Sequence, residues 1–241
     1  AFFATRAEFQ RKIPGRIIGL TKDAEERPAY RMALQTREQH IRREKATSNI
    51  CTAQVLLAVM SGMYAVWHGP EGLKRIAGRV HGLAAITARL LQEQGAALRH
   101  EHVFDTLRIA LTPEQAKALH VEAEAAGMNL RYHEGGDVGI TFDEAKNESD
   151  VVDLLGAFAR AGLLRDALDS ESLAELVGQA KADLQGTAGL LPEPLLRTTP
   201  FLEHPVFHRC RTEHEMLRYL KELENRDLSL THSMIPLGSA P

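Results

Sequence analysis

The fold of the chain is decided by the stretch Phe104-Asp105-Thr106-Leu107-Arg108-Ile109-Ala110-Leu111-Thr112-Pro113-Glu114-Gln115. Over residues 104–111 apolar and polar side chains alternate, which predicts a strand with one buried face. Thr112 offers a hydroxyl that can cap a helix, and Pro113 suits the first turn of that helix. The sequence therefore predicts a strand that passes directly into a helix.

The residues that follow predict two further strands and another helix. Residues 128–133 and 138–142 have the composition of strands, and Gly135-Gly136-Asp137 between them predicts a hairpin turn rather than a phosphate-binding loop. Ser149 is expected to cap the next helix. The apolar residues of that helix are Val151, Val152, Leu154, Leu155 and Phe158. This β-α-β-β-α order predicts a compact α+β module with an antiparallel sheet.

Two long helices are expected before this module. Residues 50–67 are apolar on several sides, which predicts a buried core helix. Its widest apolar face is formed by Ala53, Leu56, Leu57, Met60, Met63, Tyr64 and Trp67. His68-Gly69-Pro70 should end this helix, with His68 fixing the turn rather than acting as an acid or base. A second helix should run from Glu71 towards Gln94 and end at Gly95.

The two ends of the chain have weaker patterns. Residues 2–4 and 16–20 predict short strands. Residues 164–199 show little periodicity and predict a connector that ends near several prolines. Thr212 is expected to cap a short amphipathic helix. No internal repeat is found in the sequence.

Composition excludes several classes of protein. A formal net charge of −3 over 241 residues gives no electrostatic reason for binding nucleic acid or a membrane. The scattered histidines and the two cysteines lack the spacing of metal ligands or of a disulfide framework. Cys51 is expected to be a small buried residue rather than a redox sensor. The chain begins on an apolar strand, so no secretory or transit peptide is expected.

Residues 35–52 contain a cation-rich approach to a helix that starts with polar capping residues. The approach has an excess of basic side chains, and each of the three residues after it can cap the helix. The residues concerned are Arg42, Arg43, Lys45, Thr47, Ser48 and Asn49. Such a place can hold a phosphate or a carboxylate. An ordinary capped helix with a solvated charged approach explains the same pattern.

The amino-acid sequences of several blocks resemble those of one protein family. These blocks are residues 1–6, 13–19, 35–52, 64–73, 217–224 and 227–239. Together they resemble the P-protein of the glycine cleavage system, a pyridoxal-phosphate-dependent glycine decarboxylase. The last block departs from the family pattern at Ala240-Pro241. The resemblance covers almost the whole sequence.

The resemblance implies an α/β fold, as a fragment of a fold-type-I pyridoxal-phosphate transferase with an α+β small domain. It also implies three regions. Residues 1–95 correspond to the end of the large domain with long connecting helices, and residues 96–165 to the small domain. Residues 166–241 correspond to a connector and the start of the carboxyl half.

The resemblance further implies an activity. P-proteins decarboxylate glycine with pyridoxal 5'-phosphate and pass the aminomethyl group to the lipoyl arm of H-protein. The cofactor-binding lysine of the family lies outside this sequence, and Lys45 is not that lysine, so the isolated chain is expected to be inactive. The alternative is a non-catalytic interaction or dimerisation module derived from the family. Among the basic and polar residues of the approach, six are candidates to bind the cofactor or the substrate anion: Arg42, Arg43, Lys45, Thr47, Ser48 and Asn49.

Partners and location follow from the same resemblance. The expected partners are the carboxyl half of the P-protein, lipoylated H-protein and a second copy of the full-length chain. No nucleic acid, membrane or metal ion is expected. The protein is expected in the cytoplasm if it is bacterial and in the mitochondrial matrix if it is eukaryotic.

Overall fold

The computed structural model divides into two compact units. It describes residues 4–13, 17–34, 38–46, 55–184, 191–226, 228–229 and 231–232. The smaller unit combines Ala1–Met63 with Leu220–Pro241, and the larger unit is Tyr64–Tyr219. Almost all of the buried apolar core belongs to the larger unit. Helices at the two boundaries contribute residues to both units.

The smaller unit contains a two-stranded antiparallel ribbon. Strand β1 (Ile17–Lys22) pairs with strand β2 (Pro28–Ala33), with Ile17 opposite Ala33. The strand predicted at residues 16–20 is thus confirmed from residue 17 onwards. Three short helical turns accompany the ribbon: η1 (Ala7–Phe9), α1 (Gln39–Arg42) and η3 (Arg43–Lys45). Residues 2 and 3 of the first predicted strand lie outside the described residues.

The larger unit is built on a four-stranded antiparallel sheet; the sequence predicts an antiparallel sheet with three of these strands, and the first strand was not predicted. Its strands are β3 (Ala97–Leu98), β4 (Thr106–Ala110), β5 (Arg131–Tyr132) and β6 (Val138–Thr141). They lie in the order β3-β4-β6-β5. Leu107, Ile109, Val138 and Ile140 are each at most 3% exposed and form the buried face. The predicted alternation in residues 104–111 therefore sets which side of the sheet meets the core.

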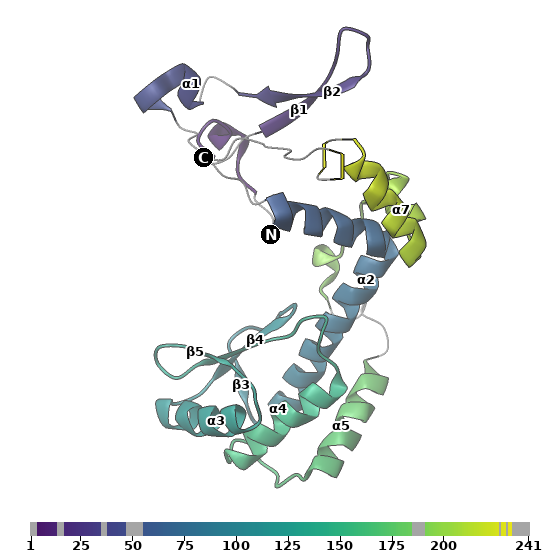
Figure 1. Cartoon of the computed structure of the whole chain (residues 1–241). Coiled ribbons are helices and arrows are strands. Elements are labelled where there is room, and N and C mark those ends of the chain that lie inside the picture. The colour runs from purple at the N-terminus through teal and green to yellow at the C-terminus, as the bar shows by residue number, and fades with distance from the viewer. Residues whose placement is uncertain are drawn as a thin grey trace. The chain divides into compact units, whose positions relative to one another are not determined.

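The other elements of this unit are helices, two of which continue into the smaller unit. They are α2 (Val55–Glu93), α3 (Pro113–Ala125), α4 (Glu148–Arg160), α5 (Ser170–Asp183), η5 (Glu193–Leu195), α6 (Val206–Arg209) and α7 (Glu213–Glu224). Helix α4 lies between α3 and α5 and packs on both (Figure 1). The later part of α2 adds Leu83, Ile86 and Leu91 to the same buried cluster. No helix in the described part of the chain is long and apolar enough to cross a membrane.

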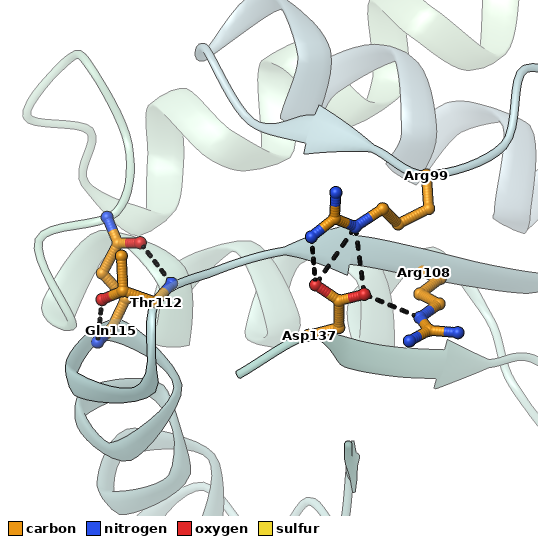
Figure 2. Close-up of polar contacts among 5 residues, drawn as sticks. All are labelled: Arg99, Arg108, Thr112, Gln115 and Asp137. Atoms are coloured by element: carbon orange, nitrogen blue, oxygen red, sulfur yellow. Dashed lines mark hydrogen bonds and ion pairs between the residues drawn. The ribbon is translucent and has the colours of Figure 1, made fainter. Parts of the chain in front are cut away.

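Local capping explains where two of these helices begin. Thr112 Oγ1 accepts from the Gln115 amide at 3.3 Å, and the Gln115 side chain accepts from the Thr112 amide at 2.9 Å (Figure 2). The predicted start of α3 is confirmed. The predicted cap of α4 is wrong, because Asn147 rather than Ser149 occupies that position. Asn147 Oδ1 accepts from the Ser149 amide at 2.8 Å, and asparagine is among the best capping residues.

Helix α2 bends where the sequence predicts that one helix ends and the next begins. Gly69 has φ 61° and ψ −177°, which is not helical, and Pro70 starts the second part. Gly95, with φ 93°, follows the end of the helix at Glu93. Both predicted glycine boundaries are therefore confirmed.

The predicted burial of the first part of α2 is wrong for residues 55–60, whereas Val66 near the bend is buried as predicted. Val55, Leu56, Leu57, Val59 and Met60 are between 49% and 72% exposed. Periodicity shows that a helix is apolar around its axis, but it does not show which partner covers it. We call these five residues the apolar face of α2. The remaining predicted residues of this helix, 50–54, lie outside the described residues.

Helix α5 was not predicted and replaces part of the expected connector. Asp169 Oδ1 accepts from the Ser172 amide at 2.9 Å and caps the helix. Leu173, Val177 and Ala180 are at most 3% exposed. Only these three positions are buried along the helix, so polar residues dominate the pattern and hide its periodicity.

Candidate functional site

The predicted anion site falls on the turns α1 and η3 of the smaller unit. Arg42 ends α1, Arg43 and Lys45 belong to η3, and all three side chains are exposed. Arg43 has φ 50°, an unusual value for a residue that is not glycine. This backbone turn places three cations within four consecutive residues. Thr47, Ser48 and Asn49 of the prediction lie outside the described residues.

The three cations are available to an external anion. Within the described part of the chain, none of them forms a salt bridge or a side-chain hydrogen bond. Glu44 is the only carboxylate within η3, whereas Glu38 is buried with 3% of its surface exposed. Guanidinium groups match the oxygen geometry of phosphate and carboxylate, and a lysine adds a compact charge. The segment can therefore attract an oxyanion, but it contains no group placed for acid–base chemistry.

A second polar cluster fixes the sheet of the larger unit. Figure 2 shows Asp137 between two arginines: Nη2 of Arg99 donates to it at 2.7 Å and Nε of Arg108 donates at 2.8 Å. The Asp137 side chain is only 8% exposed. The hydrogen bonds from Arg99, followed by its charge and by Arg108, hold the pKa of Asp137 below its ordinary value. This cluster joins the hairpin turn to the strands β3 and β4, so its role is structural.

A third cluster surrounds the bend of α2. Arg211, between α6 and α7, donates from Nη1 to the main-chain oxygens of Val66 at 2.7 Å and Trp67 at 3.1 Å. The carbonyl groups at the end of a helix have no partners within that helix, so Arg211 satisfies them. His68 lies against Tyr64, with ring centres 4.4 Å apart. The position of His68 in the turn agrees with its predicted structural role.

Sequence reasoning did not find the cavity beside this bend. The cavity has a volume of about 470 Å³. Its walls are formed by Trp67, His68, Pro70, Glu71, Gly72, Arg75, His208 and Arg211. Residues 67–75 and residues 208–211 are far apart in sequence, so no local sequence pattern predicts that they lie close together. All eight residues belong to the larger unit.

Comparison with known proteins gives the family. A family model described as glycine cleavage system P-protein matches residues 1–158. A protein of Xanthomonas euvesicatoria named glycine dehydrogenase (decarboxylating) is 52% identical over 240 residues, which is 99% of this chain and 23% of the relative. A protein of the same name from Nostoc punctiforme is 48% identical over 240 residues, covering 99% of this chain and 24% of the relative.

A solved structure agrees with these sequence matches. The crystal structure of glycine decarboxylase (P-protein) of the glycine cleavage system, in inhibitor-bound form, superposes with a TM-score of 0.51 and 30% identity. The superposition covers 72% of this chain and 38% of that chain. It confirms the predicted fold class, with its mixture of helices and antiparallel sheet. The chain spans about a quarter of the length of the curated relatives it matches, and it belongs to the glycine cleavage system P-protein family.

Proposed function

We propose that this chain contributes part of a pyridoxal-phosphate-dependent glycine decarboxylase. The reaction removes the carboxyl group of glycine as carbon dioxide and transfers the aminomethyl group to the lipoyl arm of H-protein. The observation that carries the proposal is 52% identity over 99% of the chain to a relative named glycine dehydrogenase (decarboxylating). The chain by itself is inactive on this proposal, because the lysine that binds the cofactor lies in a part of the protein outside it.

The cofactor and the substrate both carry negative charge. Pyridoxal 5'-phosphate, when bound, supplies the electron-accepting ring that decarboxylation of an amino acid needs. The protein must hold the phosphate of the cofactor and the carboxylate of glycine with cationic or neutral donors. Arg42, Arg43 and Lys45 fit this need because they are exposed and form no salt bridge within the described residues.

Each residue of the candidate set has a definite role on this proposal. The planar guanidinium groups of Arg42 and Arg43 donate paired hydrogen bonds to one oxyanion. Lys45 adds charge, which raises the local concentration of anions. Thr47, Ser48 and Asn49, which follow in the sequence, are proposed to supply hydroxyl and amide donors. These residues bind and orient an anion, and they transfer no proton.

Partners of the chain are proposed from the same family membership. They are the carboxyl half of the P-protein, a second copy of the full-length chain and lipoylated H-protein. The apolar face of α2 supports the first of these, because 49–72% exposure of five consecutive or near-consecutive apolar residues is unfavourable in water. The carboxyl half is proposed to cover this face.

A chimera tests the proposal. The matching 240 residues of the Xanthomonas euvesicatoria relative are replaced by this chain, and glycine-dependent exchange of labelled bicarbonate is measured with H-protein present. We expect the chimera to catalyse exchange and the isolated chain to catalyse none. A folded chimera without exchange, beside an active parent enzyme, contradicts the proposed function.

Single substitutions in the active chimera test the proposed residues separately. Arg42→Ala, Arg43→Ala and Lys45→Ala should each weaken the binding of cofactor or glycine, by about tenfold where a charged hydrogen bond is lost. Arg31→Ala, which changes an exposed arginine in strand β2 of the same unit, is the matched control and should have no effect. If all three variants bind like the parent, the site assignment fails while the activity of the chimera still stands.

The apolar face of α2 favours a second candidate, a non-catalytic interaction or dimerisation module. If the chain is such a module, we expect the isolated chain to associate in a concentration-dependent way. The substitutions Leu56→Glu and Leu57→Glu should each prevent this association. The exchange assay separates the two proposals, because an interaction module gives no exchange in the chimera. Analytical ultracentrifugation of the isolated chain provides the complementary measurement.

A further inference from the structure

The cavity at the bend of α2 has the size of a small-molecule site. Its volume of about 470 Å³ lies within the range of roughly 300–1,000 Å³ that ligand pockets occupy. Its two walls come from residues 67–75 and from residues 208–211. Because Arg211 binds the main chain at Val66 and Trp67, the two walls are held together. The cavity is therefore a preformed feature of the larger unit.

The lining of the cavity is positively charged. Arg75 is exposed and has no hydrogen-bond or salt-bridge partner among the described residues. Arg211 uses its donors on main-chain oxygens but keeps its positive charge, because guanidinium does not deprotonate in proteins. Glu71 is the only carboxylate in the lining, and it accepts from Nζ of Lys74 at 2.9 Å. Its charge is thus largely balanced by that lysine.

The histidines add further hydrogen-bonding capacity. His208 Nε2 lies 2.9 Å from the main-chain oxygen of Leu202. A carbonyl oxygen only accepts, so Nε2 carries the hydrogen, and Nδ1 of the neutral ring is an acceptor that donates to an anion only when the ring is protonated. His68 contributes another imidazole to the lining. The polar part of the cavity therefore combines Arg75, which has no partner among the described residues, with the imidazole groups of His68 and His208.

An apolar wall accompanies these cations. Trp67 is 38% exposed, and both Trp67 and Pro70 line the cavity. An indole face can pack on the ring or chain of an organic molecule. We propose that this cavity binds a small organic oxyanion, whose phosphate or carboxylate group meets Arg75 while its apolar part packs against Trp67. This inference is independent of the proposed decarboxylase function, since it uses none of the residues 42–49.

The chain contains its own reporter for this binding. Trp67 is the only tryptophan among the 241 residues, so selective tryptophan fluorescence reports on the cavity alone. The isolated chain is titrated with phenyl phosphate and with benzoate, and with benzyl alcohol as a neutral probe, at an ionic strength fixed by sodium chloride. We expect a saturable change with at least one of the two anions and none with benzyl alcohol. The stronger anion identifies phosphate or carboxylate as the preferred group.

Two variants and a control decide the assignment. Arg75→Gln should weaken binding of the preferred anion by at least about tenfold, because it removes a charged hydrogen-bond donor pair. Arg75→Lys keeps the charge and should weaken binding less. Arg131→Gln changes an exposed arginine of strand β5 outside the lining and should leave binding unchanged. Circular dichroism checks that each variant is folded.

Several results would overturn the inference. The inference fails if the wild-type chain gives no saturable response to either anion. It also fails if chloride alone reproduces the response, because the cavity then binds an adventitious ion only. A folded Arg75→Gln chain that binds as tightly as wild type removes Arg75 from the site. If Arg75→Gln does not fold, Arg75→Lys decides. A folded Arg75→Lys chain that binds as tightly as wild type removes the paired guanidinium hydrogen bonds from the site. An Arg131→Gln chain that loses as much affinity as Arg75→Lys indicates a non-specific charge effect.

Discussion

Nη2 of Arg211 lies in the space that a β-carbon on Gly69 would occupy. The same guanidinium donates to the main-chain oxygens at the end of the first part of α2. Gly69 makes this approach possible in two ways, since it has no side chain and it accepts a φ of 61°. The bend of α2 therefore depends on a close contact between residues that are more than 140 positions apart.

Gly69→Ala should lower the free energy of unfolding by about 2–4 kcal/mol. The backbone of Gly69, with φ 61° and ψ −177°, lies in a region essentially restricted to glycine, and it costs about 1–3 kcal/mol for a residue with a β-carbon. Displacing Arg211 and the main chain at Phe207, whose oxygen lies 2.5 Å from the added carbon, costs a similar amount. Urea unfolding followed by circular dichroism measures the change.

Gly82→Ala is the matched control for this substitution. Gly82 also lies in α2, and a β-carbon there meets no atom within 4 Å. Alanine in a helix is more favourable than glycine by about 0.5–1 kcal/mol, so this variant should be slightly more stable than wild type. Equal effects of the two substitutions would show that Gly69 has no special role.

Arg211→Met should also destabilise the larger unit, by about 1–3 kcal/mol. Methionine keeps most of the apolar stem but removes the donors that satisfy the carbonyl groups of Val66 and Trp67. The measurement is again the urea-unfolding midpoint. Arg218→Met, at an exposed position in α7, should change it by less than about 0.5 kcal/mol. An unchanged midpoint in Arg211→Met argues against the capping role.

Local sequence signals predicted much of the larger unit because its elements begin and end at residues with strong local preferences. Thr112 and Pro113 mark the start of α3, and Gly69 with Pro70 marks the bend. These signals act within a few residues of the backbone they control. They needed no knowledge of tertiary contacts, so the structure confirms them.

The features that sequence reasoning missed depend on contacts between distant residues. Arg211 and Val66 are 145 residues apart, and Arg99 and Asp137 are 38 apart. No pattern within a short window shows that such side chains meet. Arg42, Arg43 and Lys45 were found as a local charge cluster, but the cavity beside Arg75 was not, since its walls come from two separate segments.

Acid should remove the stability that Asp137 contributes. The pKa of Asp137 in the folded chain lies below its ordinary value of 3.8, because the hydrogen bonds of Arg99 favour the ionised form. The contribution is therefore complete above that ordinary value and is lost as the pH falls through the folded pKa. Asp137→Asn should be less stable than wild type at pH 7, and this difference should narrow below about pH 4.

Urea unfolding of both chains between pH 7 and pH 3 measures the difference. Asp153→Asn provides the control, because Asp153 is exposed on α4. Its difference from wild type should stay small over the whole range. A difference for Asp137→Asn that is independent of pH would mean that the ion pairs with Arg99 and Arg108 add nothing to stability.

Leu173→Ala tests whether helix α5 belongs to the hydrophobic core. The sequence pattern alone predicts a connector for this segment. Leu173 is 2% exposed and part of the main buried cluster, so its truncation should cost about 2–5 kcal/mol of unfolding free energy. Leu195→Ala, at a leucine with 66% exposure, should cost less than about 0.5 kcal/mol. Chemical denaturation compares the two variants. Similar small losses in both would place α5 outside the cooperative core, because a helix that merely rests on α4 can detach without unfolding the sheet.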